Sequence, residues 1–354
     1  MTIARPRIQS LIFEVTQHCN HACLHCYNVW QAAGHSTYPR GEHNTSRTLD
    51  LLAKALDETI CQHVTLTGGE PLLRPDLPGL LEFLQKRRVQ VTVISNGRLL
   101  DEPTAESLVQ RGVGLFELPL LSHRREVHDE LSGAPGAWDA VLSAMANVRL
   151  LRGQVVAAFV ATRKNIEHLH ETIRLAFALG ARGIMLNRFN PGGRGREHLE
   201  ELLPTVEQVR AALETAEAAA VEFGIPVSCS IPIQPCLIDI SRFPHLGFGF
   251  CTAGSERAYY ALDPLGNLRP CNHTDIILGN LFDENFADLI APERMATFTC
   301  AIPAVCADCS RRLECQGGCK ASAQVCYGSL TAEEPFLRQR AGRSLKPTSL
   351  PIHE

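Results

Sequence analysis

Short β-branched runs alternate with longer helical patterns along residues 8–223 of this 354-residue chain. This alternation is typical of repeated βα units around a parallel sheet. Six units are fewer than the eight of a closed (β/α)8 barrel, so we expect an open sheet or a partial barrel. The predicted strands cover residues 8–16, 63–69, 89–95, 114–121, 154–162 and 183–189.

The helical patterns between these strands each carry one apolar stripe that can pack on a sheet. The clearest stripes are Leu49, Leu52, Ala53 and Leu56, then Leu77, Leu80, Leu81 and Leu84. Polar residues that precede helical patterns are predicted N-caps, namely Asp76, Asp101 and Thr205.

After an Ala- and Glu-rich helix predicted over 205–223, the sequence becomes rich in Pro, Gly and Cys. We therefore expect a first domain over 1–225, a linker or bridging region over 226–250 and a smaller Cys-rich domain over 251–337. The polar, Arg-rich stretch 338–354 is predicted to be a flexible tail.

The chain has 14 cysteines, too many for a soluble protein of this size unless they form disulfides or bind metal. Residues 1–10 do not resemble a secretory leader, and the longest apolar run, 155–161, is far shorter than the roughly 20 residues of a membrane span. We therefore expect a cytoplasmic protein, in which clustered cysteines more often bind metal. A formal charge of -4 gives no electrostatic argument for nucleic acid or a membrane as a partner.

Cys19, Cys23 and Cys26 form C-x3-C-x2-C in the loop after the first predicted strand. Three thiolates cannot easily fill a tetrahedral metal site, so one position is left open. In a four-iron cluster this leaves one iron free to chelate a small molecule, whereas electron-transfer clusters normally have all four irons bound to Cys. The alternative is a structural zinc site completed by a histidine of the loop, for which there are three candidates: His18, His21 and His25.

The same motif, followed by the aromatic Tyr27, resembles the hallmark of the radical S-adenosylmethionine (SAM) superfamily. The resemblance implies a [4Fe-4S] cluster on the three cysteines, with SAM on its open iron. One electron would cleave SAM to methionine and a 5′-deoxyadenosyl radical, which abstracts a hydrogen from the substrate. The fold implied is α/β, a partial (β/α)6 TIM-type barrel with a smaller Cys-rich α+β C-terminal domain.

Two motifs at predicted strand ends continue the resemblance. Gly68-Gly69-Glu70 is similar to the start of the family's Gly-Gly-Glu-Pro motif, in which the backbone and the carboxylate receive the SAM ammonium. Glycines allow close backbone approach, and a carboxylate pairs with a cation. Ser95 and Asn96 are similar to the family's ribose-contacting segment. Such glycine motifs are also common turn signals, but three matches in chain order, each at the carboxyl end of a predicted strand, favour a SAM site.

Further along, Ser122 and Arg163 lie where relatives have residues near the SAM carboxylate. Residues 187–195 are similar to a loop that lines the family's SAM pocket, and they lack the Gly-Lys-Ser/Thr ending of a phosphate-binding loop. His128-Asp129 suggests a metal-dependent phosphohydrolase, but no supporting His/Asp pairs accompany it. We therefore interpret this pair as local helix and loop structure.

The carboxy-terminal cysteines resemble the SPASM extension of radical SAM enzymes, which holds one or two auxiliary [4Fe-4S] clusters. A zinc ribbon is the alternative for C-x2-C-x5-C-x3-C taken alone. The pattern consists of Cys251, Gly266-x4-Cys271, Cys306, Cys309, Cys315, Cys319 and Cys326.

By this resemblance Cys251, Cys271 and Cys319 hold the first auxiliary cluster, and Cys306, Cys309 and Cys315 the second. Two clusters need eight thiolates, whereas the pattern supplies seven. The family's final Cys usually follows an Asp-Pro, but the sequence around Glu334-Pro335 lacks it. We expect Cys326 to be the fourth ligand of the second cluster. The first then has an open iron or takes its fourth ligand from a set of three: Cys229, Cys236 and Cys300.

We predict an enzyme that modifies a ribosomally made peptide or protein by crosslinking, thioether formation, epimerisation or a related maturation. The alternatives are an enzyme of small-molecule cofactor or antibiotic biosynthesis and, more distantly, a zinc-binding scaffold. Expected partners are the substrate, a flavodoxin- or ferredoxin-type electron donor, and a separate peptide-recognition protein, because the first strand begins by residue 8. No catalytic base is assigned; candidates by type alone are Cys229, Cys236 and Tyr259.

Overall fold

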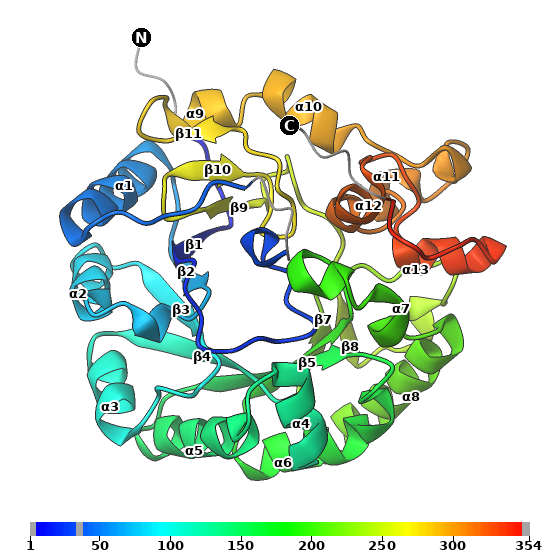
Figure 1. The fold of residues 1–354 in the computed structure, drawn as a ribbon, viewed down its shortest axis with the longest axis horizontal. Helices are drawn as coiled ribbons and strands as arrows, with labels where there is room; N and C mark the ends of the chain where they lie inside the picture. The colour runs from blue at the N-terminus through cyan, green and yellow to red at the C-terminus, as the bar shows by residue number, and fades with distance from the viewer. Residues whose placement is uncertain (1–4, 33–37, 349–354) are drawn as a thin grey trace.

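The computed structural model describes residues 5–32 and 38–348. Its central feature is one curved sheet of eleven strands with helices along its outer face (Figure 1). Six parallel strands follow one another in chain order: β1 (Ser10–Thr16), β2 (His63–Gly68), β3 (Gln90–Ile94), β4 (Val113–Pro119), β5 (Val155–Ala161) and β6 (Gly183–Arg188).

Five short strands extend this sheet at both edges. On one side lie β7 (Val227–Cys229) and β8 (Leu246–Phe248), both parallel to β6. On the other side β9 (Tyr259–Leu262) pairs in parallel with β1, followed by the antiparallel β10 (Asn267–Arg269) and β11 (Gly279–Asn280). Among the described residues β8 and β11 each have one neighbour, so the sheet is a partial barrel that does not close.

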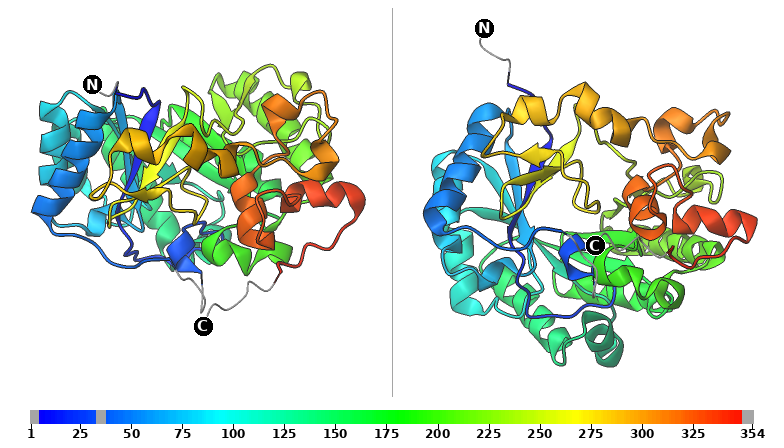
Figure 2. Two further views of the ribbon diagram at one scale, coloured as in Figure 1. Left: turned by 90° about the horizontal axis from the view of Figure 1, so that it is seen from above. Right: turned by 45° about the horizontal axis from the view of Figure 1, so that its top comes forward.

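Eight described helices connect the strands of the first part of the chain, and most of them cover the convex side of the sheet (Figure 1, Figure 2). They are α1 (Thr45–Glu58), α2 (Leu77–Lys86), α3 (Glu102–Gln110), α4 (Arg125–Ser132), α5 (Ala137–Leu150), α6 (Leu169–Ala178), α7 (Leu199–Leu202) and α8 (Val206–Phe223). The last part of the chain adds α9 (Phe286–Leu289), α10 (Pro292–Thr299), α11 (Arg312–Cys315), α12 (Lys320–Tyr327) and α13 (Pro335–Arg338).

Short 3-10 helices lie in the connecting loops. They are η1 (Val29–Gln31), η2 (Pro71–Leu73), η3 (Ile166–His168), η4 (Gly193–Arg196), η5 (Ile240–Arg242), η6 (Ala304–Cys306) and η7 (Gln339–Ala341). No described helix is both long and apolar enough to pass through a membrane.

The apolar stripes predicted for the helices form the core between helices and sheet. Leu80, Leu81 and Leu84 of α2 are fully buried, and burying each such side chain stabilises the fold by about 1.5–3 kcal/mol. Of the predicted N-caps, Asp101 accepts a hydrogen bond from Thr104 N, and Thr205 forms a capping box with Gln208. The Asp76 carboxylate instead pairs with Arg74.

The six predicted strands agree with β1 to β6 to within two residues at each end. The stretch 226–250, expected to be a linker or bridging region, adds β7 and β8 to the same sheet. The described part of the predicted tail also has fixed contacts. Tyr327 Oη donates to Leu345 O over 3.3 Å, and Thr348 N donates to Cys326 O over 3.0 Å. The expected flexibility of 349–354 lies outside the described residues.

Candidate active site

Cys19, Cys23 and Cys26 lie on a loop that follows β1 and passes across the inside of the ring, drawn in dark blue in Figure 1. Backbone hydrogen bonds fix this loop at both ends. Glu70 N donates to His18 O over 2.7 Å, and Gly195 N donates to Cys26 O over 2.9 Å. The carboxyl ends of β2 and β6 therefore hold the loop from two sides.

The three thiols of this loop are close enough to influence one another electrostatically. Burial raises the pKa of Cys23, and the neighbouring Cys26 and Cys19 thiolates raise it further. Burial likewise raises the pKa of Cys26 to about 11, whereas the Arg194 guanidinium acts in the opposite direction. Burial thus disfavours the charged form of these thiols, and the iron of a thiolate-ligated iron-sulfur cluster would supply the positive charge that stabilises their thiolates.

A single-ion site is not formed here. All fourteen cysteines lie in the described part of the chain, and none is in a disulfide. Within residues 5–32 and 38–348, no three His, Cys, Asp or Glu side chains converge closely enough for one metal ion. The ligands of a four-iron cluster bind different irons and are spread more widely.

The two glycines after β2 bring the backbone of this turn against the cysteine loop. A Cβ atom on Gly69 would lie 1.9 Å from His18 O, and one on Gly68 would lie 2.2 Å from Thr16 O. Gly68 also has a φ of 137°, in the region that favours glycine. The glycine pair therefore allows the loop to dock on the sheet.

Glu70 connects this turn to the end of β3. Its carboxylate accepts hydrogen bonds from Ser95 Oγ over 2.8 Å and from Asn96 N over 2.7 Å, as well as from Leu72 N. Burial raises the pKa of Glu70 to about 7, although these three bonds lower it. The Asn96 side chain reaches Asn20 of the cysteine loop at 2.7 Å. The structure therefore brings Glu70, Ser95 and Asn96 together beside this loop.

Two weaker sequence candidates have protein partners in the structure. The buried Ser122 hydroxyl contacts His168 Nδ1 at 3.0 Å and accepts from Arg124 N. Arg163 is exposed, and its Nε donates to Leu203 O over 3.1 Å. Each of these side chains already has a local structural role.

The His128-Asp129 pair is part of the local structure, as its interpretation above anticipates. His128 Nδ1 accepts from Leu121 N, and Asp129 accepts from Gly136 N and Trp138 N at 2.8 Å each. These bonds hold the connection between α4 and α5.

The first set of carboxy-terminal thiols lies beside the cysteine loop. Burial raises the pKa of Cys271, and Cys319 and Cys251 raise it further, so these three are neighbours. The rings of Tyr27 and His273 lie 4.2 Å apart, and Asn272 Nδ2 donates to Tyr27 Oη over 3.1 Å. The residue after the first thiol motif thus contacts residues that directly follow Cys271.

Asn190, in the loop after β6, links the same region from the other side. Its Nδ2 lies 3.3 Å from Cys319 Sγ and 3.2 Å from His273 Nδ1. Tyr259 of β9 also faces this set, because Cys271, Cys251 and Cys319 all raise its pKa after burial, the largest cause. Asn190 belongs to the loop 187–195 that the sequence predicts to line the SAM pocket, whereas His273, two residues after Cys271, was not identified from the sequence.

The second set, Cys306, Cys309 and Cys315, lies on η6, α11 and the turn between them. Cys326 is elsewhere, on α12, fully buried in an apolar cluster that includes Leu121 and Phe189. No described contact joins Cys326 to the second set. Cys326 instead lies within electrostatic reach of Cys319, a member of the first set, and its ligand role stays a prediction from the sequence.

Two sequence models of known families match this chain. That of the radical SAM superfamily covers residues 13–176, and that of the iron-sulfur cluster-binding SPASM domain covers residues 251–310. The chain belongs to the radical SAM superfamily and carries a SPASM domain. It is therefore a radical SAM enzyme, with a [4Fe-4S] cluster, SAM and auxiliary clusters as cofactors.

Similar proteins match along nearly all of the chain. PqqA peptide cyclase of Gluconobacter oxydans is 26% identical over 95% of this chain and 91% of its own length. The AdoMet-dependent heme synthase of Methanosarcina barkeri is 25% identical over 96% of this chain and 98% of its own. Streptococcus suis SuiB bound to precursor peptide SuiA superposes with a TM-score of 0.68 and 15% identity, over 94% of this chain and 76% of SuiB.

A buried ion pair attaches the SPASM region to the radical SAM core. Arg269, two residues before Cys271, donates to the Glu14 carboxylate on β1 and to Thr274 O over 2.7 Å. Both charged side chains are almost completely inaccessible to solvent. The pair positions the first auxiliary thiol set against the sheet.

Replacing Arg269 with Met should destabilise the iron-free protein by about 3–5 kcal/mol, because Glu14 would stay buried without its partner. Urea unfolding monitored by circular dichroism measures the change. Arg87→Met, which removes an exposed pair with Asp57, should leave the midpoint nearly unchanged. Equal midpoints for Arg269→Met and the unsubstituted protein would contradict a stabilising role.

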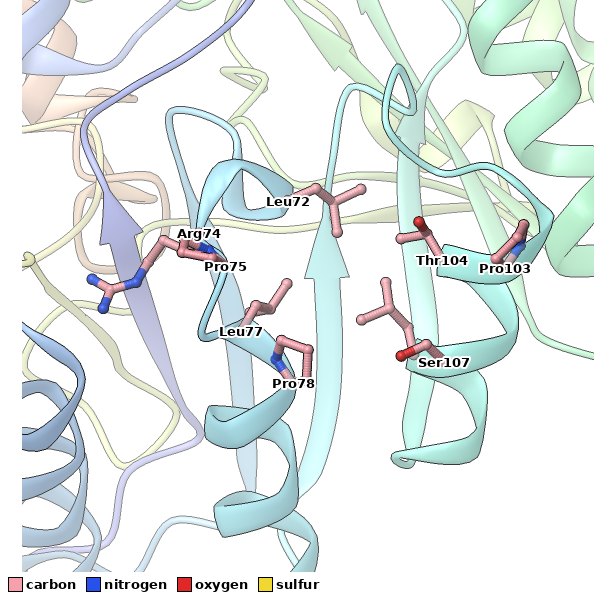
Figure 3. Close-up of a pocket in the computed structure, with 9 residues that line it drawn as sticks. Leu72, Arg74, Pro75, Leu77, Pro78, Pro103, Thr104 and Ser107 are labelled. Atoms are coloured by element: carbon pink, nitrogen blue, oxygen red, sulfur yellow. The ribbon is translucent and has the colours of Figure 1, made fainter.

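Two surface grooves lie apart from these thiols. In the first, Leu72, Leu77 and Pro78 face Thr104 and Ser107 between α2 and α3 (Figure 3). Its lining includes no cysteine and no residue of the SAM motifs. The second groove is lined by residues of α10 and α12 and by Cys300. Cys300 is therefore a surface thiol.

Proposed function

We propose that this radical SAM enzyme modifies a ribosomally made peptide or protein. The similarity to PqqA peptide cyclase along 95% of the chain carries this proposal, because it includes both the SAM-binding part and the auxiliary thiols. The second candidate is a small-molecule substrate such as a tetrapyrrole. The comparable similarity to an AdoMet-dependent heme synthase favours it.

For the core we assign Cys19, Cys23 and Cys26 to the [4Fe-4S] cluster. The backbone of Gly68 to Glu70 is proposed to receive the SAM ammonium. The Glu70 carboxylate acts as a positioning group, since its bonds to Ser95 and Asn96 fix the ends of β2 and β3 relative to each other. An ionised carboxylate has about four acceptor positions, so beyond these three donors Glu70 can also pair directly with the SAM ammonium, as the resemblance implies.

Ser95 and Asn96 are assigned to the ribose side of SAM. Asn96 contacts both Glu70 and Asn20, so it stands between the turn after β2 and the cysteine loop. Ser122 and Arg163 are proposed to shape the pocket through His168 and Leu203, the partners that they contact in the structure.

The substrate is proposed to lie between the cysteine loop and the first auxiliary thiol set, beside Tyr27, Asn190 and His273. Glu117 faces the same interior, because its strand neighbours Phe116 and Leu118 point into the helix-side core. Burial raises the pKa of Glu117 to about 7, and it lies within electrostatic reach of Tyr27. No described ion pair or side-chain hydrogen bond engages the Glu117 carboxylate. We propose that it faces the substrate.

With its cofactors bound, the site supplies reductive cleavage of SAM and hydrogen abstraction from the substrate. The chain's own residues hold SAM, exclude water and orient the chosen C–H bond. We propose a flavodoxin- or ferredoxin-type protein as electron donor and a separate protein for peptide recognition. The domain assignment that accompanies this proposal is a core over 1–225, a bridging region over 226–250 and an auxiliary domain over 251–337.

The test is anaerobic turnover of the reconstituted enzyme with SAM, a low-potential reductant and a short Cys- or Gly-rich precursor peptide encoded beside its gene. Mass spectrometry should show loss of two hydrogens for a crosslink, or deuterium uptake without another mass change for epimerisation. A variant that lacks the first three cysteines is the matched control. An unchanged peptide, together with conversion of a tetrapyrrole, would exclude the peptide proposal in favour of the second candidate.

A further inference from the structure

The second auxiliary thiol set has three members at pattern positions, whereas a fully protein-ligated cluster needs four. The family's final cysteine is missing near Glu334, and Cys326 lies in a separate apolar cluster. Of the remaining cysteines, Cys229 is buried on β7 and Cys300 lines a surface groove. The fourth thiol must therefore come from a segment outside the SPASM pattern or be absent.

The connection between β7 and β8 packs against the second set. Gln234 Nε2 donates to Gly317 O over 3.4 Å and to Glu334 Oε1 over 2.5 Å. Gly318 makes this approach possible, because a Cβ atom there would lie 2.0 Å from Gln234 Nε2. Gly317 lies beside the set, since a Cβ atom there would lie 3.5 Å from Cys306 Sγ.

Cys236 lies in a turn of this connection. Leu237 N and Ile238 N both donate to Gln234 O, over 2.9 and 3.1 Å, which places Cys236 at the tip of the turn. On its other side, Asp239 is within electrostatic reach of Arg311. Cys236 therefore lies between Gln234 and Asp239, both of which approach the segment 306–317. Both views in Figure 2 show this part of the chain, in yellow-green, beside the orange segment that carries the second set.

The thiols themselves influence one another. Cys236 and Cys309 both lie within electrostatic reach of Cys306. Cys236, Cys306 and Cys309 likewise lie within electrostatic reach of Cys315. The Cys236 side chain is exposed and has no described hydrogen bond, so no other protein group competes for its sulfur.

We infer that Cys236 is the fourth ligand of the second auxiliary [4Fe-4S] cluster, with Cys306, Cys309 and Cys315. Each thiol releases its proton when it binds iron. Of the eight thiolates that two clusters need, the one that is missing then belongs to the first auxiliary cluster, whose protein ligands are Cys251, Cys271 and Cys319. A cluster ligated in this way also connects the segment between β7 and β8 to the SPASM domain.

The experiment uses full-length protein in which Cys19, Cys23 and Cys26 are replaced by Ala, so that all bound iron is auxiliary. After anaerobic reconstitution, iron and sulfide are measured per chain, and electron paramagnetic resonance spectra are recorded for reduced and oxidised samples. Adding Cys236→Ala should lower the iron content by the iron of one cluster. Alternatively, the cluster loses one iron, and the oxidised sample then shows the paramagnetic resonance signal of a three-iron cluster. Adding Cys61→Ala, the matched control at a cysteine outside both auxiliary sets, should change neither readout.

Two further variants keep the inference open to disproof. Cys236→Ser preserves the size of the side chain and offers an oxygen ligand, so we expect retained iron with an altered spectrum of the reduced cluster. Unchanged iron and unchanged spectra in both Cys236 variants would overturn the inference. Loss of iron in Cys326→Ala but not in Cys236→Ala would also overturn it and return the ligand role to Cys326.

Discussion

Replacing Cys19, Cys23 and Cys26 together with Ala should lower the formation of 5′-deoxyadenosine from SAM by more than about 10³-fold, equivalent to ~4 kcal/mol of activation free energy. No other described cysteine lies in this loop and could replace the three ligands. The cluster, and with it the open iron that would bind SAM, is therefore lost. The measurement is liquid chromatography of anaerobic reactions that contain reductant and SAM.

The auxiliary iron should survive this triple substitution, because the two carboxy-terminal sets lie on other segments of the chain. Iron analysis of the same sample therefore serves as the control for folding. Continued SAM cleavage at the rate of the unsubstituted enzyme would contradict the assignment of these three cysteines. Loss of all iron would instead show that the auxiliary cysteine sets do not acquire their clusters independently of Cys19, Cys23 and Cys26.

Replacing Gly69 with Ala should destabilise the iron-free protein by about 1–3 kcal/mol and weaken SAM binding at least about tenfold. The added Cβ would lie 1.9 Å from His18 O, a backbone atom, so the cysteine loop and the turn after β2 must move apart. This movement breaks the Gly69 N to Thr16 O and Glu70 N to His18 O hydrogen bonds, both shorter than 3 Å.

Gly79→Ala is the matched control for this substitution. Gly79 lies in α2 with nothing within 4 Å of its Cβ position, so Ala should stabilise the helix by about 0.5–1 kcal/mol and leave SAM binding intact. Calorimetric titration of the reconstituted protein with SAM measures the affinity, and urea unfolding of the iron-free protein measures the stability. Equal SAM affinity in both variants would contradict the role given to this turn.

The larger elements of the fold could be predicted from the sequence because their apolar periodicity extends over enough residues. β2 and β5 are β-branched runs between turn signals, and α2 repeats its leucines at helical spacing. β7 and β8 could not be predicted, since each has three residues and short strands carry almost no periodic signal. Tertiary pairing makes them strands, since β7 pairs with β6 and β8 pairs with β7.

The candidate site was predictable where ligands are neighbours in sequence. The C-x3-C-x2-C motif needs only one loop. The surroundings of Cys236 and Cys326 depend on how distant segments pack, which spacing does not encode. Glu70 illustrates the same limit at one side chain, because its partners Ser95 and Asn96 come from the adjacent strand and follow from the register of β2 against β3.

The pairing of β9 with β1 has a practical consequence for dissecting this enzyme. β1 is hydrogen-bonded on both sides, to β2 and to β9, and β9 lies within the auxiliary part of the chain. A truncation that ends before β9 would turn β1 into an edge strand with a row of unpaired N–H and C=O groups. Such edges act as templates for aggregation between chains. The auxiliary part thus protects the first strand of the core, and studies of its clusters are better served by point substitutions than by deletion.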